Sequence, residues 1–321
     1  MMDDGMILLW GLSGDDPFDC IAAELQRRGA GHVVVDQRNL HCVSIEAADG
    51  DPGSGLLRTP EIEVRLESIT AAYLRVYDVR TLLSMNSAEE GNGGLEHALR
   101  TERTLSSWCE QGTALVVNPP TAMSTNNSKP YQAMRIREFF RVPSTLITTD
   151  REAAEDFCAR FDAAIYKSVS GVRSIVERLK PEHRERFADL RWCPTQFQEY
   201  VPGVDYRVHV VGSDTFACRI ETDADDYRYA GKQGARRTIT PCTIPESIAG
   251  RAVAVSAALG LHLAGVDLRC TPDGDWFCFE VNPSPEFAFY ASWTDQPIGD
   301  ALATMLLDPP NAVHERNVIG Q

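Results

Sequence analysis

The pattern of hydrophobic and polar positions predicts alternating strands and helices in the first third of the chain. Residues 6–12 and 33–36 are short apolar runs typical of buried strands. Between them we predict an amphipathic helix, with Pro17 at its first position and Gly29 after its end. A strand, a helix and a second strand in this order favour a small parallel sheet.

Further elements extend this first unit. Residues 69–77 and 114–117 are typical of strands, and residues 95–110 of a helix. Residues 49–55, which are rich in Asp, Pro, Gly and Ser, predict a loop. The composition changes at Asn118-Pro119-Pro120, and we place the first domain boundary there.

The middle of the chain carries a lysine at the end of a short strand. Residues 163–166 lead into Lys167, and residues 168–171 predict a tight turn before a returning segment at 173–176. A lysine beside such a turn can hold phosphate together with backbone N–H groups. A lysine that simply extends into solvent is the alternative. Upstream, Thr149-x-x-Glu152 predicts a capping box that opens a helix.

A later strand has one polar and one apolar face. Asp205, Arg207 and His209 alternate with apolar residues, and residues 212–214 turn this strand into the next one, which carries Arg219. A three-residue loop would place the two arginines opposite each other, where they would hold an anion. A two-residue loop would shift that register. The pattern leaves both open.

The stretch AGVDLRCTPDGDWFCFEVNPSPE, residues 264–286, predicts a β-hairpin. Asp273-Gly274 lies between two apolar runs and favours a two-residue type I′ turn, because that turn needs positive φ at both positions. Counting back from this turn places Asp267 directly opposite Glu280, with Asn282 on the same face.

Two facing carboxylates repel each other, so this hairpin predicts a cation between them. Carboxylate and amide oxygens suit Mg²⁺, which also takes substrate phosphates as ligands. The alternative is an exposed hairpin whose acids face water. Helices predicted over residues 245–260 and 297–307 flank the hairpin.

Composition narrows the function classes. The chain has 321 residues, 43% of them hydrophobic, which is enough for two or three folding units. A net charge of −15 without any basic run argues against nucleic-acid binding. The acidic N-terminus predicts neither a signal peptide nor a membrane span. Nine cysteines without a CxxC pair favour a reducing, cytoplasmic location.

Taken in order, these motifs resemble one known family. The matching segments are NNSKPYQ with Lys129, IYKSVSG with Lys167, QEYVPGVDYRVHVVG from Gln198 to Gly212, Arg219, GVDL with Asp267, and FEVNPSP with Glu280 and Asn282. The set is similar to the ATP-grasp ligases, specifically the RimK-like and glutathione-synthetase-like branch, over roughly residues 118–307.

The resemblance implies an α/β fold of the ATP-grasp type. A Rossmann-like pre-ATP-grasp domain would span residues 1–118. A small subdomain with the phosphate loop would span residues 119–200, and a metal-binding, catalytic subdomain residues 201–321.

The resemblance also implies an ATP site and a magnesium site. Two lysines would bind phosphates, hinge residues would meet the adenine, and a Gly- and Ser-containing loop would close over the phosphates. The residues implied for ATP are Lys129, Lys167, Gly171, Ser174, Glu199, Tyr200, Val201 and Asp205, the last of which would reach the ribose or the substrate. Asp267, Glu280 and Asn282 would hold Mg²⁺, with two ions expected.

The implied reaction is carboxylate activation. A carboxylate attacks the γ-phosphate to form an acyl phosphate, and an amine or hydroxyl then displaces phosphate. Charge develops on the transferred oxygens, so Arg207 and Arg219 are the catalytic candidates. The candidates for substrate binding are Arg75, Arg173, His209 and Arg228.

The substrate stays open between a small carboxylate with an amine and a peptide. AYLRVYD and SKPYQAMRIREFFRVPSTLIT also resemble ligases that cross-link ribosomal precursor peptides through ester or amide bonds. The chain departs from them at NPSPEFAFY, where they carry Gly and Gln before a tryptophan. A non-catalytic nucleotide-binding regulator is the alternative of another class, and the intact lysine pair and metal triad argue against it. We expect no nucleic-acid or membrane partner, and a homodimer is left open.

Overall fold

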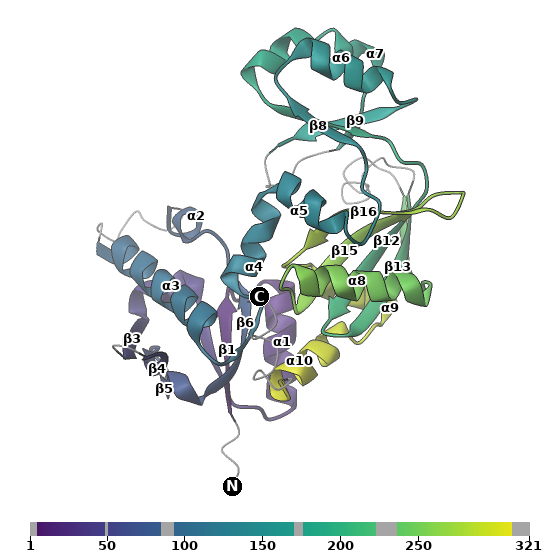
Figure 1. Ribbon diagram of the computed structural model, residues 1–321. Helices are drawn as coiled ribbons and strands as arrows, with labels where there is room; N and C mark the ends of the chain where they lie inside the picture. Colours follow the sequence, from purple (N-terminus) through teal and green to yellow (C-terminus); the bar gives the residue numbers. More distant parts are fainter. Residues whose placement is uncertain (1–4, 49–50, 85–92, 170–175, 223–235, 310–321) are drawn as a thin grey trace, which may run out of the picture.

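The structure is a computed structural model that describes residues 5–309, except for residues 49–50, 85–92, 170–175 and 223–235. Within these residues the strands form four sheets. Three of them, here called the N-terminal sheet, the small sheet and the C-terminal sheet, build the main parts of the molecule. Figure 1 shows these at the lower left, at the top and at the right.

The N-terminal sheet is parallel and confirms the predicted strand–helix–strand start. Its order is β2-β1-β6-β7, with β1 at Met6–Gly11, β2 at His32–Asp36, β6 at Ile69–Arg75 and β7 at Leu115–Val117. Helix α3 (Gly93–Gln111) packs on one face. Helices α1 (Asp16–Arg27) and α10 (Ile298–Leu307) pack on the other. Helix α10, near the end of the described chain, therefore completes the hydrophobic core around the N-terminal sheet.

A three-stranded antiparallel sheet beside it was not predicted. It has the order β3-β4-β5, with β3 at Ser44–Ala48, β4 at Asp51–Arg58 and β5 at Glu63–Arg65. The loop predicted over residues 49–55 is wrong, because β4 already begins at Asp51. Gly55 has a φ of 145°, and a Cβ there would lie 1.9 Å from the Glu46 carbonyl oxygen. The glycine permits close strand pairing and is not a loop residue.

The small sheet is antiparallel and has the order β10-β9-β11-β8. Its strands are β8 (Thr145–Thr148), β9 (Ala164–Ser168), β10 (Glu177–Arg178) and β11 (Thr195–Glu199), and its helices are α6 (Arg151–Ala159) and α7 (Pro181–Arg184). Helix α6 begins after Asp150, whose side chain accepts a hydrogen bond from Ala153 N at 2.7 Å. The predicted capping box at Thr149 is therefore wrong. Of the predicted returning segment 173–176, only Val176, directly before β10, lies among the described residues.

The C-terminal sheet is antiparallel and has the order β14-β13-β12-β15-β16. Its strands are β12 (Val204–Val211), β13 (Asp214–Thr222), β14 (Arg237–Pro241), β15 (Leu263–Cys270) and β16 (Trp276–Asn282). Helix α8 (Glu246–Ala258) packs on one face. Helix α9 (Phe287–Thr294), which was not predicted, packs on the other face, where Tyr290 joins a cluster with Cys218 and Ile220.

The turn between β15 and β16 differs from the predicted type I′ turn. Thr271 N donates to Asp275 O at 2.9 Å, so three residues lie between these two. Gly274 has a positive φ of 86°, whereas Asp273 does not. A three-residue loop that ends in a left-handed glycine is the next most common way to close a hairpin.

A β-bulge in the same hairpin restores the predicted pairing. Leu268 pairs with Cys278, but the next residue, Asp267, pairs with Glu280. Phe279 is thus an extra residue on β16. The longer loop and the bulge cancel, and the facing pair predicted from the sequence is confirmed.

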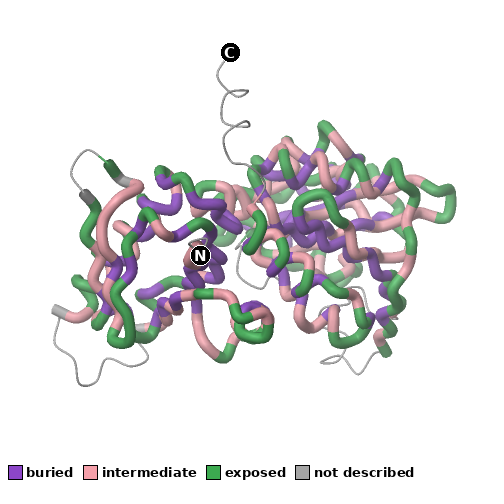
Figure 2. Tube along the Cα trace, turned by 90° about the horizontal axis from the view of Figure 1, so that it is seen from below, coloured by how far each residue is buried: buried purple, intermediate pink, exposed green. Residues whose placement is uncertain are grey.

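Short helices join these parts. Figure 1 shows α4 and α5 running between the N-terminal sheet and the small sheet. Their bounds are α4 Pro120–Ser124 and α5 Lys129–Ile136, while α2 spans Val79–Ser84 and the 3₁₀ helices are η1 Gln37–Cys42, η2 Leu66–Ser68, η3 Thr125–Asn127 and η4 Phe187–Trp192. Figure 2 shows the buried residues concentrated in the interior of the molecule, with exposed residues around its outside. None of the described helices is long and apolar enough to cross a membrane.

Candidate active site

The first acid of the hairpin holds a buried arginine. Arg207 on β12 pairs with Asp267 across the ladder, and its Nη1 donates to Asp267 Oδ1 at 2.8 Å. Only 5% of the Arg207 side chain and 17% of the Asp267 side chain are exposed. Gly265 leaves room for the guanidinium, because a Cβ there would lie 2.1 Å from Arg207 Nη2. The motif GVDL therefore provides both the acid and the space for its partner.

The second acid holds the first of the predicted phosphate-binding lysines. Lys129 begins helix α5, and its Nζ donates to Glu280 Oε1 at 2.6 Å and to Asn126 Oδ1 at 2.8 Å. Ser128 caps the helix by accepting a hydrogen bond from Tyr131 N at 3.4 Å. The sequence Ser-Lys-Pro thus starts a helix and directs its first side chain to the hairpin.

Two buried amides fix the hairpin against the preceding segments. Gln132 on α5 donates through Nε2 to Val281 O at 2.8 Å and accepts from Val281 N at 3.2 Å. Asn118 donates through Nδ2 to Leu263 O at 2.6 Å and to Pro283 O at 2.7 Å. The side chains of both amides are almost fully buried, so each bond is made where water cannot replace it.

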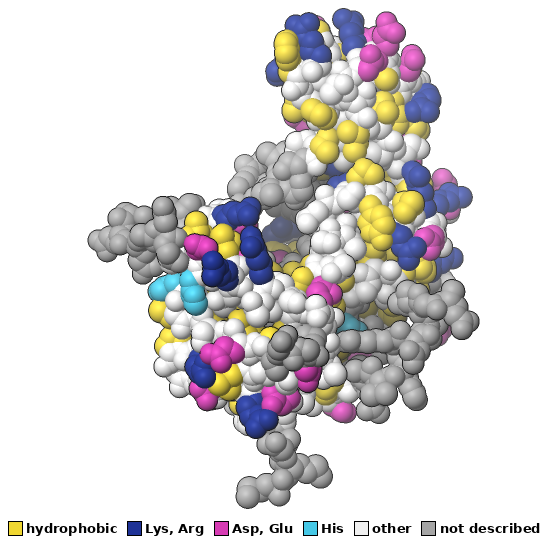
Figure 3. Space-filling view, turned by 60° about the vertical axis from the view of Figure 1, so that its left-hand side comes forward, with side chains coloured by type: hydrophobic (Ala, Val, Ile, Leu, Met, Phe, Trp, Pro, Cys, Tyr) yellow, Lys and Arg dark blue, Asp and Glu magenta, His cyan; other side chains and the backbone are white. Residues whose placement is uncertain are grey.

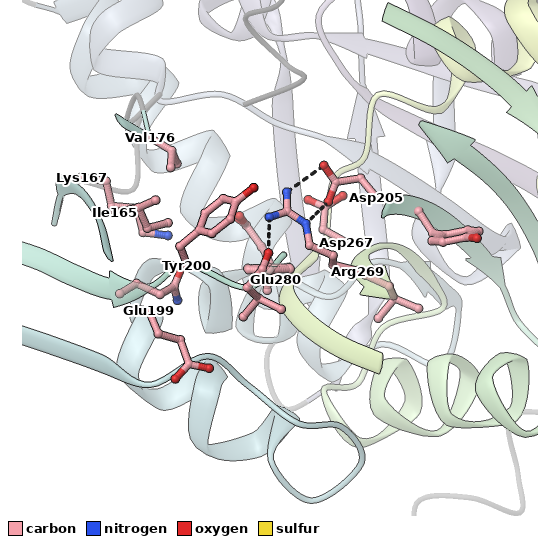
Figure 4. A pocket seen from close by; sticks show the side chains of 14 residues that line it. Ile165, Lys167, Val176, Glu199, Tyr200, Asp205, Asp267, Arg269 and Glu280 are labelled. Atoms are coloured by element: carbon pink, nitrogen blue, oxygen red, sulfur yellow. Dashed lines mark hydrogen bonds and ion pairs between the residues drawn. The ribbon is translucent and has the colours of Figure 1, made fainter. Parts of the chain in front are cut away.

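A pocket lies between the small sheet and the C-terminal sheet, and we call it the hinge pocket (Figure 4). Figure 3 shows a hollow below the uppermost part of the molecule, with Lys and Arg side chains visible in it. The hinge pocket is lined by five of the predicted ATP residues and by both facing acids: Lys167, Glu199, Tyr200, Val201, Asp205, Asp267 and Glu280.

Arg269 organises one wall of the hinge pocket. It donates to both carboxylate oxygens of Asp205, at 2.7 Å and 2.9 Å, and to Val201 O at 2.9 Å. The ring of Tyr200 lies 4.0 Å from the guanidinium carbon of Arg178. The predicted contact of Asp205 with a ribose or a substrate stays a prediction, and the structure adds that this carboxylate is held by Arg269.

A second pocket lies beyond the two acids, and we call it the α9 pocket. It is lined by Arg207, Arg237, Asp267, Glu280, Asn282, Glu286, Phe289 and Tyr290. Asp267 and Glu280 therefore line both pockets. Molecules in the hinge pocket and in the α9 pocket would meet at these two carboxylates.

His209 does not reach either pocket, which corrects its prediction as a substrate-binding residue. Its side chain is fully buried beneath Arg207, with Nε2 3.5 Å from Arg207 Nε, and its ring lies 4.9 Å from that of Tyr290. Burial, together with the charge of Arg207, lowers the pKa of His209 well below its usual value. The histidine stays neutral and supports Arg207 from below.

Arg75 is likewise a framework residue, contrary to its prediction as a substrate contact. Its side chain is 7% exposed. It bonds to Asp15, donates to Ser284 O and Pro285 O at 3.0 Å each, and donates to Glu286 Oε2 at 2.8 Å. Because these partners occupy its donors, Arg75 ties strand β6 to the segment that follows Asn282.

Arg219 lies on the opposite face of the sheet from Arg207. Two residues link β12 and β13, since Val211 pairs with Asp214, and Arg219 consequently pairs with Tyr206. Its guanidinium binds Glu221 at 2.8 Å. The register question is settled in favour of the two-residue loop, and the proposed anion site between Arg207 and Arg219 is wrong.

Four predicted site residues, Gly171, Arg173, Ser174 and Arg228, lie outside the described residues.

The chain is similar to known ATP-grasp ligases. No family model matches the chain. The ATP-grasp ligase PsnB, solved with a phosphomimetic variant of a minimal precursor, Mg and ADP, is 26% identical and superposes with a TM-score of 0.78. The superposition covers 95% of this chain and 98% of PsnB. This chain is a member of the ATP-grasp ligase superfamily.

Two other similar proteins agree with membership of this superfamily. The tetrahydromethanopterin:alpha-L-glutamate ligase of Methanocaldococcus jannaschii is 25% identical over 211 residues, which are 60% of this chain and 70% of that protein. The macrocyclase MdnC from Microcystis aeruginosa MRC, solved with the precursor peptide MdnA, superposes with a TM-score of 0.78 over 94% of this chain and 99% of MdnC. At 19% identity this second likeness shows the fold alone.

The donor set of the ligase fits Mg²⁺. Asp267, Glu280 and Asn282 offer hard oxygen ligands at the boundary of the two pockets. Ser284 N donates to Asn282 Oδ1 at 2.9 Å and orients that amide. Over the described part of the chain, no group of three His, Cys, Asp or Glu side chains could hold a metal by itself. Two carboxylates and an amide are nevertheless sufficient for Mg²⁺, which completes its shell with water and substrate phosphates.

The sequence did not point to several residues that shape the site. They are polar or aromatic side chains that line the two pockets, contact a pocket residue or fix the hairpin: Asn118, Gln132, Arg178, Arg237, Arg269, Glu286 and Tyr290. Arg269 has a local signal, because it lies two residues after Asp267 on the same strand face. The others depend on contacts between distant segments.

Proposed function

We propose that the protein is an ATP- and Mg²⁺-dependent ligase that activates a carboxylate as an acyl phosphate and joins it to an amine. The observation that carries this proposal is that Asp267 and Glu280 line both the hinge pocket and the α9 pocket. Phosphoryl transfer needs a nucleotide and an acceptor that meet in line at a metal site.

The hinge pocket is proposed to hold ATP. Lys129 and Lys167 would bind its phosphates, and the backbone of Glu199 and Val201 would meet the adenine. Lys167 lies on β9 with its side chain in the hinge pocket, and Lys129 lies 2.6 Å from Glu280. These positions support phosphate binding next to the metal ligands.

The metal site is proposed to comprise Asp267, Glu280 and Asn282. Bound Mg²⁺ would neutralise the charge on the phosphates and on the transferred group. Arg207 lies at the same boundary and lines the α9 pocket, so it is the remaining candidate for stabilising charge on the transferred oxygens.

A peptide substrate is the second candidate, and a specific observation favours it. PsnB, which is 26% identical, was solved with a phosphomimetic variant of a minimal precursor. Beside the α9 pocket, Trp293 is 54% exposed, and its ring lies 6.0 Å from that of Phe289. An exposed tryptophan next to an active site suits a substrate larger than one amino acid. All nine cysteines are free thiols, which supports the predicted cytoplasmic location as a further part of the proposal.

The nucleotide part is tested by thermal unfolding. ATP or ADP with Mg²⁺ should raise the melting temperature, because each binds the folded state selectively. Lys167→Ala should reduce this shift, since the lysine lines the hinge pocket. Lys180→Ala removes an exposed lysine outside that pocket and is the matched control. If millimolar ATP and ADP leave the melting temperature of the wild type unchanged, the proposed function is refuted.

A further inference from the structure

Glu286 occupies an unusual position in the α9 pocket. It is the N-cap residue of α9, and it lines that pocket together with Asp267, Glu280 and Asn282. Its side chain is 46% exposed. Glu286 therefore lies beside the proposed metal site with a half-buried side chain, and the proposed function so far gives it no role.

The two carboxylate oxygens of Glu286 differ in their hydrogen bonding. Oε2 accepts a hydrogen bond from Arg75 Nη2 at 2.8 Å. Oε1 is buried and has no hydrogen-bond partner among the described residues. A carboxylate oxygen that is buried without a partner is costly, and such atoms call for a ligand or a water.

The carboxylate is held rigidly by its arginine. Arg75 is itself bonded to Asp15 and to the carbonyl oxygens of Ser284 and Pro285. Burial raises the pKa of Glu286 above its usual value, although the charge of Arg75 acts against this. Glu286 is thus a preorganised carboxylate with a stronger tendency to take a proton than an exposed glutamate.

We propose that Glu286 recognises the ammonium group of the incoming nucleophile in the α9 pocket and removes a proton from it. This inference rests on the proposed function and adds the residue that selects an amine over a hydroxyl. The guanidiniums of Arg237 and Arg207 already lie over the rings of Phe289 and Tyr290 in this pocket, at 4.9 Å and 5.6 Å from the ring centres, so the selection rests on the carboxylate of Glu286. A hydroxyl carries no charge and would gain little from this carboxylate.

The proposed step transfers one proton to Glu286 and forms the amide bond. R–NH₃⁺ gives one proton to Glu286 and becomes R–NH₂. The nitrogen lone pair attacks the acyl carbon, the C–N bond forms, and the bond from that carbon to the phosphate oxygen breaks. Phosphate leaves with the electron pair and takes up the second N–H proton.

The test uses n-butylammonium chloride as the probe and n-butanol as its neutral counterpart, both at matched ionic strength and in the presence of ADP and Mg²⁺. Thermal unfolding of the wild type should respond to the ammonium and not to the alcohol. Glu286→Gln should weaken the apparent affinity for n-butylammonium by about tenfold or more, because it removes a charged hydrogen-bond acceptor. Gln at this position keeps an oxygen for Arg75, and Glu246→Gln, an exposed exchange at the start of α8, is the control.

The outcomes separate the two proposals. A response to ADP and Mg²⁺ that survives in Glu286→Gln, with the ammonium response lost, supports the role of Glu286. An equal ammonium response in both proteins, or none in the wild type, overturns it and leaves the nucleotide site intact. If Glu286→Gln does not fold, a structure of the wild type with n-butylammonium decides, since the nitrogen must lie within about 3 Å of Oε1.

Discussion

The two facing acids should differ sharply in their effect on stability when each is neutralised. Asp267→Asn puts a neutral side chain in place of the carboxylate that Arg207 Nη1 bonds, in a setting where only 5% of that arginine is exposed. Glu280→Gln leaves Lys129, which is 21% exposed and also bonded to Asn126. We expect the first exchange to destabilise the fold and the second to leave it nearly unchanged.

The size of the difference follows from burial. Removing one partner of a buried ion pair costs about 3–5 kcal/mol, and Asn keeps an oxygen that still accepts from Arg207, so we expect about 3 kcal/mol for Asp267→Asn. A partly exposed pair contributes about 1 kcal/mol or less, which we expect for Glu280→Gln. The two variants should therefore differ by about 2 kcal/mol in the free energy of unfolding.

Urea unfolding followed by far-UV circular dichroism measures this difference, and amide exchange on β12 and β15 assigns it to the C-terminal sheet. Adding Arg207→Met to Asp267→Asn should recover part of the loss, because the double variant no longer buries the Arg207 charge beside a neutral side chain. Both single variants should lose turnover as well, since both acids are proposed metal ligands. Equal stabilities of Asp267→Asn and Glu280→Gln, within about 0.5 kcal/mol, would refute the reasoning.

Three further predictions concern the surroundings of these acids. Lys129→Met should strengthen the binding of Mn²⁺ in the absence of nucleotide, measured by electron paramagnetic resonance, because Glu280 loses a competing cation; unchanged binding would contradict the pair. Gly265→Ala should displace Arg207 and lower both turnover and melting temperature, and a variant with wild-type values would show that the guanidinium has room to move. Arg219→Gln should leave the response to ATP and Mg²⁺ within error of the wild type, since Arg219 lies on the other face of the sheet; a large loss would restore it to the site.

In the β15–β16 hairpin, the sequence predicted the correct facing pair from an incorrect turn length. Counting from an assumed two-residue turn placed Asp267 opposite Glu280, and the structure has this pair. The turn is in fact one residue longer, and the bulge at Phe279 absorbs the difference. A bulge leaves little trace in the hydrophobic pattern, so only the sum of the two shifts was predictable.

Arginine placement shows the limit of sequence reasoning. Arg207 and Arg219 looked equivalent, but one residue of loop length decides which face each occupies. Arg75 lies at the end of β6, and nothing in its own segment indicates that Asp15 and the 284–286 segment would surround it. Polarity and spacing predict that an arginine has a partner, whereas the identity of that partner depends on contacts between distant segments.

The four cations of the site divide into a framework and one exchangeable member. Each of four acids holds a cation from a different element, and the pairs are Asp267–Arg207, Asp205–Arg269, Glu286–Arg75 and Glu280–Lys129. The three arginine side chains are 5%, 14% and 7% exposed, and Lys129 is 21% exposed. A planar, buried guanidinium loses its bonds if it moves, whereas a lysine on a flexible stem can turn from a carboxylate to a phosphate. We therefore expect nucleotide and Mg²⁺ to break the Lys129–Glu280 pair and to leave the arginine pairs in place. Binding would then free Glu280 for the metal and Lys129 for the phosphates in a single event.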